Sequence, residues 1–294
     1  MTTKSPTRHI ERPDGRRVAM YDLTPGAPAD APVVLLCHIA PGSGAFDPDP
    51  AATAARGVRL VSLDRPGYGG SDPMPESEFA TVEVAIEDAA AVLREVLPAG
   101  AKAGVAGWSA GGRIALGLAA RYPELVGRVA VIGTPAPDEH VQWIPAENKA
   151  GLDALRDASA AEAHAALAGA FGPMLEATQG DARFALLGLA DADAAVLATE
   201  GTVDRVRDLV DTMLAQGGVG MIADVAGYSL RPWGFDPADV TADVLLGYAT
   251  EDFVGPAHGE WYQKTLPSAR LELVADTGHL LVVPFWDRAL AHLT

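Results

Sequence analysis

The chain has 294 residues, which is enough to bury a large core and fits one α/β domain or a core that carries a long insertion. Apolar residues make up 49% of the sequence and charged residues 21%, proportions that favour neither a disordered nor a fibrous protein. The net charge of -17 argues against nucleic acid or an anionic membrane surface as a partner, because both would repel the protein.

The N-terminal sequence and the single cysteine indicate where the protein is expected to reside and which cysteine-based sites it lacks. Residues 1–6 contain no apolar segment like that of a secretory signal, and no run of eighteen apolar residues occurs, so we expect a cytoplasmic protein. Cys37 is the only cysteine, which excludes an internal disulfide and a cysteine-rich metal site. Because Cys37 ends an apolar run that begins at Val33, we interpret it as a small buried side chain.

The extended segments come first in the chain and recur to its end. Two stretches between His9 and Leu23 flank Pro13-Asp14-Gly15, whose turn chemistry predicts an antiparallel hairpin. Six apolar runs bounded by turn residues follow, and near-continuous apolar runs of this kind are typical of parallel strands buried on both faces. They span residues 32–38, 58–64, 102–107, 126–133, 244–249 and 270–274.

Two helical segments alternate with these predicted strands. Apolar residues recur at helical spacing from Val82 to Val96, and Pro98 follows as a stop. Residues 110–122 form a second segment, rich in Ala and Leu, that ends before Pro123. Strand alternating with helix predicts an α/β fold with right-handed crossovers.

Residues 138–240 interrupt this alternation with long Ala-rich stretches of helical periodicity and no convincing strand. A simple crossover needs only about a dozen residues. We therefore interpret the segment as a helical lid over the carboxyl edge of the sheet, where open α/β sheets bind ligands. The predicted domains are a core formed by residues 1–137 and 241–294 and a cap formed by residues 138–240. The alternative is that these helices merely extend the core.

The motif Gly107-Trp108-Ser109-Ala110-Gly111-Gly112 lies directly after a predicted strand and directly before a predicted helix. A serine in this place sits on a tight strand-to-helix turn, and the flanking glycines let strand and helix approach without side-chain clashes. The bare pattern is weak in a glycine-rich chain, but its placement makes Ser109 the candidate nucleophile.

A serine hydroxyl needs a base that takes its proton, and the base needs a carboxylate that fixes its tautomer. His279 is the candidate base because it follows the last predicted strand, where loops at the carboxyl edge converge. Asp252 is the candidate acid because it follows the strand over residues 244–249, although Glu251 or Asp138 could replace it. The chain order Ser, Asp, His is the one associated with nucleophile elbows.

The chain resembles the alpha/beta hydrolase superfamily almost from end to end. Besides the elbow, His38-Ile39-Ala40-Pro41-Gly42-Ser43 and the segment Asp64 to Ser71 are similar to segments of capped, esterase-like members. The resemblance implies an eight-stranded, mostly parallel sheet with flanking helices, a lid inserted after the sixth strand, and no cofactor or metal. It also implies that the backbone N–H groups of Ala40 and Ala110 form the oxyanion hole.

One departure from the family pattern concerns the oxyanion loop. Ile39 stands where the family usually has a glycine, and a β-branched residue tolerates positive φ poorly, so the loop is expected to be shaped unusually. We expect His38 to brace this loop rather than transfer protons, and Asp64 and Arg65 to stabilise the Pro66-Gly67 turn by local hydrogen bonds.

The substrate pocket is the least determined feature. Trp108, Phe171, Met174 and Trp233 are the tentative pocket residues, although packing is the competing interpretation for large apolar side chains at helical spacing. The wider set of candidates for an apolar wall from the lid also contains Trp143, Phe184, Met221, Tyr228 and Phe235.

The leading hypothesis is a serine hydrolase that cleaves small or medium carboxylic esters through an acyl-enzyme. The same triad could serve an amidase, a C–C bond hydrolase, a perhydrolase or a hydroxynitrile lyase, because fold and triad do not choose the substrate. Dehalogenase and epoxide hydrolase chemistry is disfavoured, since those related enzymes place a carboxylate where this chain has Ser109. A non-catalytic binding protein is the alternative outside enzymology. The expected partner is a small-molecule substrate, and the oligomeric state stays open.

Overall fold

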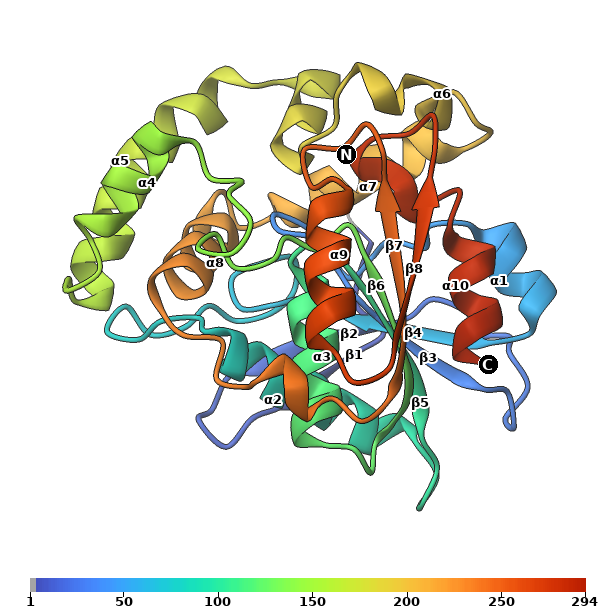
Figure 1. The fold of residues 1–294 in the computed structure, drawn as a ribbon. Coiled ribbons are helices and arrows are strands. Elements are labelled where there is room, and N and C mark those ends of the chain that lie inside the picture. Colours follow the sequence, from blue (N-terminus) through green and yellow to red (C-terminus); the bar gives the residue numbers. More distant parts are fainter. Residues whose placement is uncertain (1–3) are drawn as a thin grey trace.

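The computed structural model describes residues 4–294, which form an eight-stranded sheet with helices on both faces (Figure 1). The strands are β1 (Arg8–Glu11), β2 (Arg17–Asp22), β3 (Val33–Cys37), β4 (Arg59–Leu63), β5 (Ala103–Trp108), β6 (Val126–Ile132), β7 (Asp243–Ala249) and β8 (Ala269–Val274). Their order across the sheet is β1-β2-β4-β3-β5-β6-β7-β8. The pairs β1–β2 and β2–β4 are antiparallel and the others are parallel. The predicted hairpin, the six predicted strands and the mostly parallel eight-stranded sheet are confirmed.

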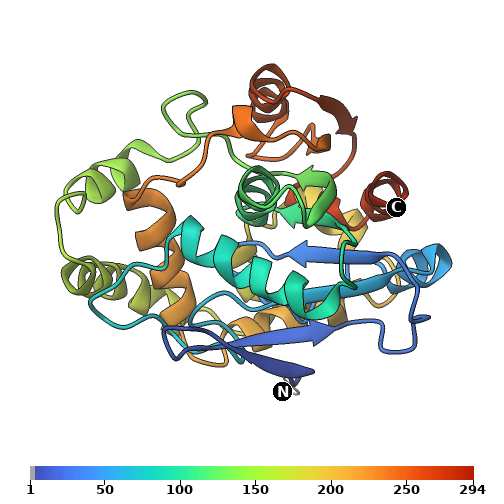
Figure 2. The same ribbon diagram turned by 90° about the horizontal axis from the view of Figure 1, so that it is seen from below.

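Helices cover both faces of the sheet, which is why its central strands are apolar throughout. One face carries α2 (Val82–Val96), α3 (Gly111–Arg121) and α9 (Pro256–Thr265), and the other carries α1 (Pro50–Arg56) and α10 (Trp286–Leu293) (Figure 1). Every residue of β3 and of β5 is buried, as parallel strands between two helical layers require. Seen from below, the β1–β2 hairpin lies at one edge of the molecule (Figure 2).

The two predicted crossover helices form where local signals place them. The side chain of Thr81 caps α2 by accepting a hydrogen bond from the Val84 N–H. The helix ends at Val96, two residues before Pro98. Helix α3 starts directly after the elbow and buries nearly all of its residues against β5, β6 and α2. This packing fixes the elbow at the carboxyl edge of the sheet.

Between β6 and β7 the chain forms only helices, which lie beyond the carboxyl ends of the strands (Figure 1). They are α4 (Ala146–Asp153), α5 (Ala160–Ala177), α6 (Ala194–Leu197), α7 (Thr202–Met213) and α8 (Val219–Leu230), with short 3₁₀ turns between and after them. Helices α5 and α8 share a small apolar cluster of their own, whereas α7 packs onto the core of the sheet. We propose to treat residues 138–240 as a cap, the name used below.

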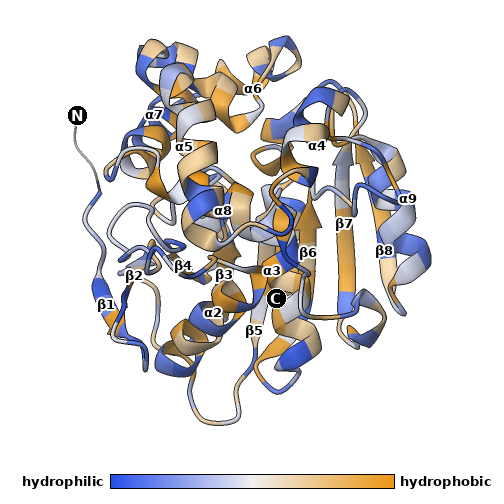
Figure 3. Cartoon of the chain, turned by 90° about the vertical axis from the view of Figure 1, so that its left-hand side faces the viewer, coloured by the Kyte–Doolittle hydropathy of each residue, from blue (hydrophilic) through white to orange (hydrophobic). Residues whose placement is uncertain are grey.

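Hydropathy follows this layering. Strands in the middle of the sheet, such as β6, are coloured as hydrophobic, whereas the outer helices show both hydrophobic and hydrophilic residues (Figure 3). No helix within residues 4–294 is long and apolar enough to cross a membrane.

Candidate active site

Ser109 lies on a strained turn that the sequence around it makes possible. Its φ of 54° is unusual for a residue with a side chain, and such a conformation costs roughly 1–3 kcal/mol. A side-chain carbon at Gly107 would collide with the backbone of Gly111, and one at Gly111 would collide with the Cys37 carbonyl. The turn is held by a 2.8 Å hydrogen bond from the Ser109 N–H to the Ile132 carbonyl. The glycines of the motif are therefore required by close backbone approach.

The three predicted catalytic side chains meet at this turn. The Ser109 hydroxyl lies 2.9 Å from Nε2 of His279, and Nδ1 of His279 lies 2.8 Å from Oδ2 of Asp252. The side chains of His279 and Asp252 are each only 1% exposed. Because Nδ1 donates its proton to the carboxylate, Nε2 is left free to accept the serine proton. Residues from the ends of β5, β7 and β8 thus form one hydrogen-bonded row.

The two alternative acids lie elsewhere. Glu251 is exposed, and in the described part of the chain its carboxylate accepts no hydrogen bond from the ring of His279. The Asp138 carboxylate accepts hydrogen bonds from the Trp143 and Ile144 N–H groups and from Lys149. Of the three carboxylates considered, only Asp252 lies against His279.

His279 is held from three sides. The Trp108 indole N–H donates to the His279 carbonyl at 2.9 Å, and the ring of Phe253 lies 4.7 Å from the imidazole. The buried Asp193, from the cap, accepts the N–H of Leu280 at 2.8 Å and that of Ala190 at 3.1 Å. Asp193 was not singled out by the sequence, because nothing in its local pattern points to a loop almost ninety residues away.

The loop after β3 carries Ala40, one of the two predicted oxyanion donors. Ile39 is not among the described residues with positive φ, so its branched side chain meets no backbone strain. Instead Ile39 is buried, and the loop continues through a cis peptide bond between Ala40 and Pro41. Ala40 and Ala110 both line the cavity at Ser109, and among residues 4–294 neither backbone N–H donates to another backbone group. Both are free to donate to a ligand.

Comparison with known proteins identifies the family of the chain. A family model described as alpha/beta hydrolase fold matches residues 32–284. The chain belongs to the alpha/beta hydrolase fold family. No curated protein sequence gives a significant match.

Solved structures of this family resemble the chain over nearly its whole length. A hydrolase from Pseudomonas aeruginosa PA01 is 18% identical with a TM-score of 0.67, and 96% of each chain is covered. The esterase RhEst1 from Rhodococcus sp. ECU1013 is 20% identical with a TM-score of 0.65, covering 97% of this chain and 95% of that one. The enol-lactonase from Burkholderia xenovorans LB400 is 19% identical with a TM-score of 0.63, and 97% of each chain is covered. At these identities the likeness establishes the fold.

In this alpha/beta hydrolase fold protein, His38 braces the loop that carries Ala40. Its Nδ1–H donates to the Ile39 carbonyl at 2.7 Å, and its Nε2 accepts the Arg65 N–H at 3.3 Å. Complete burial, and then the neighbouring Arg65, lower the pKa of His38 well below its usual range. The ring is therefore neutral and structural, as its hydrogen bonds require.

The prediction that Arg65 stabilises its own turn is wrong. Its guanidinium donates to the carbonyls of His38 and Ile39, at 2.5 and 2.7 Å, and to the carboxylate of Asp224 on α8, at 2.7 Å. The hydroxyl of Tyr68 also donates to Asp224, at 2.8 Å. A buried guanidinium seeks a carboxylate, and the one within reach lies in the cap, 159 residues away. Asp64 does bond locally, accepting the Gly70 N–H at 2.9 Å.

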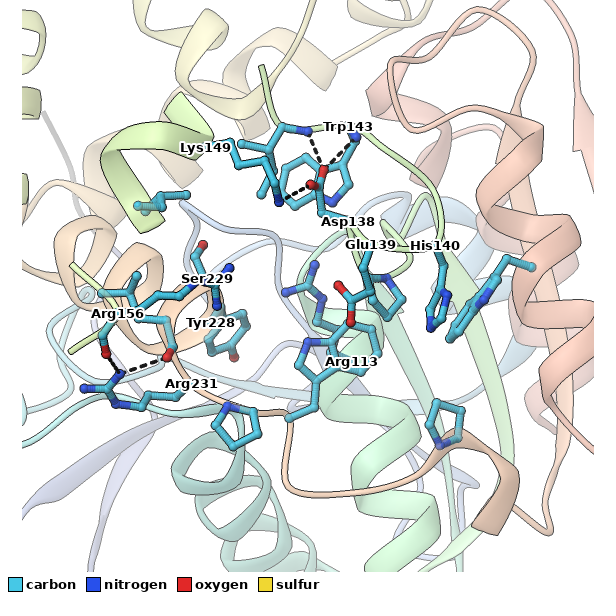
Figure 4. Close-up of a pocket in the computed structure, with 18 of the residues that line it drawn as sticks. Arg113, Asp138, Glu139, His140, Trp143, Lys149, Arg156, Tyr228, Ser229 and Arg231 are labelled. Carbon is cyan, nitrogen blue, oxygen red and sulfur yellow. Dashed lines mark hydrogen bonds and ion pairs between the residues drawn. The ribbon is translucent and has the colours of Figure 1, made fainter. Parts of the chain in front are cut away.

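The cavity that contains Ser109 and His279 is called the serine cavity below. It has a volume of about 310 Å³. Its apolar lining comes from Pro41, Pro135, Ala185, Leu186, Leu187, Met221, Val225 and Phe253. A second, outer cavity of about 690 Å³ adjoins it and shares Arg113, Trp143, Tyr228 and Ser229 with it (Figure 4).

None of the four tentative pocket residues lines the serine cavity. Trp108 is buried against Phe46, and Phe171 packs onto the apolar cluster of α5 and α8. Met174 is 39% exposed, and Trp233 lines the outer cavity. Phe171 thus follows the competing interpretation, in which a large apolar side chain at helical spacing packs between helices.

Other members of the wider candidate set do line the serine cavity, namely Trp143, Met221 and Tyr228. Arg113, which also lines it, was missed because a single charged residue in a helix pattern gives no signal about what it faces. Within residues 4–294 there is no group of three His, Cys, Asp or Glu side chains that could hold a metal ion.

Proposed function

We propose that this protein is a serine hydrolase that cleaves small or medium carboxylic esters through an acyl-enzyme. The observation that supports it most directly is the row formed by the Ser109 hydroxyl, the imidazole of His279 and the carboxylate of Asp252, with separations of 2.9 and 2.8 Å. These distances are within hydrogen-bond reach for proton transfer. The strained φ of Ser109 adds weight, because such strain clusters at functional sites.

In the first half of the reaction, Ser109 attacks the ester carbonyl while His279 takes its proton at Nε2. Asp252 holds the ring in the tautomer that leaves Nε2 free, and it stabilises the imidazolium that forms. His279 then gives the proton to the departing alcohol. Water repeats the sequence on the acyl-enzyme and releases the acid, with His279 again as base and then acid.

The developing oxyanion needs donors that are in place before the reaction. The backbone N–H groups of Ala40 and Ala110 are suited to this role, since both residues line the serine cavity beside Ser109. A donor of this kind is worth about 3–4 kcal/mol in the transition state. His38 and Arg65 support the loop that carries Ala40 through the carbonyls of residues 38 and 39.

The volume of the serine cavity supports substrates of small or medium size. At about 310 Å³ it lies at the lower end of the range of ligand pockets, which is roughly 300–1,000 Å³. Its mostly apolar lining suits the hydrocarbon part of an acyl or alcohol group.

Replacing the nucleophile tests the proposal. Ser109→Ala should lower kcat on a p-nitrophenyl ester by about 10⁶-fold and abolish labelling by a fluorophosphonate probe, while the free energy of unfolding stays near that of the wild type. Ser229→Ala, which alters another serine of the same cavity, should still be labelled. Full activity of the Ser109→Ala variant would rule out the mechanism, and an unlabelled wild type would favour a binding protein.

Substrate panels separate the remaining chemistries of the same triad. We expect p-nitrophenyl esters of increasing acyl length to be hydrolysed, with the rate falling once the chain exceeds the cavity. A panel of amides, lactones, cyanohydrins and vinylogous diketones tests the other reactions. Turnover of these without ester hydrolysis would replace the esterase assignment by the corresponding activity.

A further inference from the structure

Three hydrogen-bond donors at the boundary between the serine cavity and the outer cavity lack partners. The guanidinium Nε of Arg113, the indole Nε1 of Trp143 and the hydroxyl of Tyr228 are buried without a hydrogen-bond partner among the described residues. All three side chains line both cavities. Buried polar groups in proteins are almost always satisfied, so three unsatisfied donors on side chains that line the same two cavities call for an explanation.

Arg113 is the most demanding of the three. It is 6% exposed, and no carboxylate among residues 4–294 forms an ion pair with it. The ring of Trp233 lies 4.6 Å from the guanidinium carbon and that of Trp143 lies 6.0 Å away, so two aromatic rings hold it in place. Burial lowers the pKa of Arg113, but the group remains a cation at neutral pH.

The other charged groups near the serine cavity already have partners within the protein. Asp224 lines the cavity but is paired with Arg65 at 2.7 Å, and Asp252 is bonded to His279. Glu139, which is exposed and lines the outer cavity, acts on Arg113 only through its longer-range field. In Figure 4 Arg113 lies between Tyr228 and Glu139, with no interaction drawn to either. Of the charged side chains that line the serine cavity in the described part of the chain, Arg113 is therefore the one without an ion-pair partner.

We propose that the serine cavity takes esters that carry a carboxylate, and that Arg113, Tyr228 and Trp143 bind this carboxylate. The proposal rests on the hydrolase function proposed above and names its substrate class. A guanidinium, a phenol O–H and an indole N–H are all donors, and a carboxylate offers two oxygens with about four acceptor sites. A neutral ester would leave the buried cation without a partner, whereas an anionic one satisfies all three groups.

The position of Arg113 also suits the geometry of the reaction. It follows Ser109 by four residues and belongs to the first turns of α3, so its backbone lies about 6 Å along the helix from the elbow. The ester carbonyl at Ser109 and a carboxylate at Arg113 would therefore be joined by a short chain. Monoesters of linear dicarboxylic acids have this form.

Equilibrium binding to the Ser109→Ala variant tests the proposal without turnover. The probes are the monomethyl esters of succinate, adipate and suberate, each compared by calorimetry at pH 7.5 with the dimethyl ester of the same acid. We expect the best-fitting monomethyl ester to bind at least about 10-fold more tightly than its dimethyl ester, because only it carries the charge. Equal binding of the members of all three pairs would overturn the proposal.

Variants of the donors identify which groups carry the preference. Arg113→Gln should reduce the monomethyl-to-dimethyl affinity ratio by about 10- to 100-fold, and Tyr228→Phe should reduce it by about 3- to 10-fold. Arg94→Gln, which alters an exposed arginine on α2, is the matched control and should keep the ratio. The Tyr228 hydroxyl has no hydrogen-bond partner among residues 4–294, so we expect Tyr228→Phe to fold even if Arg113→Gln does not. If the ratio survives in Tyr228→Phe and Arg113→Gln, the assignment is wrong.

A variant of Glu139 tests the charge preference of the site independently. Glu139 and Arg113 both line the outer cavity, so Glu139→Gln should tighten monomethyl ester binding about 2- to 5-fold by removing a charge of the same sign as the ligand. Weaker binding in this variant would contradict the proposed site.

Measuring the hydrolysis of a charged and a neutral p-nitrophenyl ester distinguishes a failure of the carboxylate site from a failure of the hydrolase proposal. The wild type should have a higher kcat/KM for the mono-p-nitrophenyl ester of adipic acid than for p-nitrophenyl hexanoate, and Arg113→Gln should lower the ratio of the two constants. If the wild type hydrolyses neither ester but still binds the monomethyl esters selectively, the hydrolase proposal fails and the carboxylate site remains. If it hydrolyses both equally, the carboxylate site fails and the hydrolase proposal remains.

Discussion

Two buried arginines lie near the candidate active site, and they differ in what surrounds them. Arg65 donates to the carbonyls of His38 and Ile39 and to the carboxylate of Asp224, so its charge is fully compensated within the protein. Arg113, which lines the serine cavity, has aromatic rings around it but no carboxylate in contact among the described residues. The first arginine has a structural partner, and the second has donors left over for a ligand. A buried charge thus indicates function only after its partners have been counted.

The largest effect should come from breaking the compensated pair. Arg65→Met leaves Asp224 buried without its cation, and we expect the free energy of unfolding to fall by about 3–5 kcal/mol. Urea unfolding at pH 7.5 measures this. The double variant Arg65→Met with Asp224→Leu removes both charges and should recover most of the loss. A change below about 1 kcal/mol in Arg65→Met would show that the pair is not compensated as described.

Asp193 is an intermediate case, because its buried carboxylate is satisfied by two backbone N–H groups rather than by a cation. Asp193→Ala should lower the free energy of unfolding by about 1–3 kcal/mol, since those N–H groups lose their acceptor. As a positioning residue for the loop that carries His279, it should also affect kcat by about 10-fold with KM unchanged. Asp193→Asn retains an acceptor oxygen and should restore kcat. A change in KM alone would contradict the positioning role.

Asp47 is a buried carboxyl group whose partners are the Thr53 hydroxyl and the Asp49 N–H. Burial raises its pKa to about 6, above the unfolded value near 3.9. A raised folded pKa means that stability is fully present below the unfolded pKa and is lost as the pH rises through 6. The stability advantage of Asp47→Asn over the wild type should therefore grow by about 1 kcal/mol between pH 5 and pH 8. Parallel urea curves with a pH-independent offset would show that Asp47 is not the titrating group.

The smallest expected change in the free energy of unfolding comes from replacing Arg113, which makes it the direct counterpart of the Arg65 variant. Arg113→Gln should change the free energy of unfolding by less than about 1 kcal/mol, or increase it, because an unpaired buried charge does not stabilise the fold. The measurement is the same urea unfolding used for Arg65→Met. A loss as large as that of Arg65→Met would mean that Arg113 has a structural partner after all.

The sequence predicts the sheet and the row of three side chains because each depends on a local signal. Apolar runs between turn residues mark the strands, and Ser109, Asp252 and His279 each come shortly after the end of one of them. Parallel strands bring their carboxyl ends to one edge, so local assignment is enough to place these residues together. Ile39 does not adopt a positive φ, in line with the poor tolerance of a β-branched residue for that conformation.

The lining of the cavity could not be predicted in the same way. Asp224 reaches Arg65 across 159 residues, and the absence of a partner for Arg113 depends on how the cap packs over α3. Neither property is encoded in a short window of sequence. Phe171 and Trp143 are both large aromatic residues of the cap, yet the first packs between helices and the second lines the cavity.

The ion pair between Arg65 and Asp224 has a consequence for protein engineering. The guanidinium that pairs with Asp224 on α8 also donates hydrogen bonds to the carbonyls of residues 38 and 39. The cap and the loop that carries Ala40 are therefore both fixed by one side chain. Chimeras that import a foreign segment between β6 and β7 must therefore keep an acidic residue at the place of Asp224. Without it, a graft intended to change only selectivity would also disturb the chemistry beneath it.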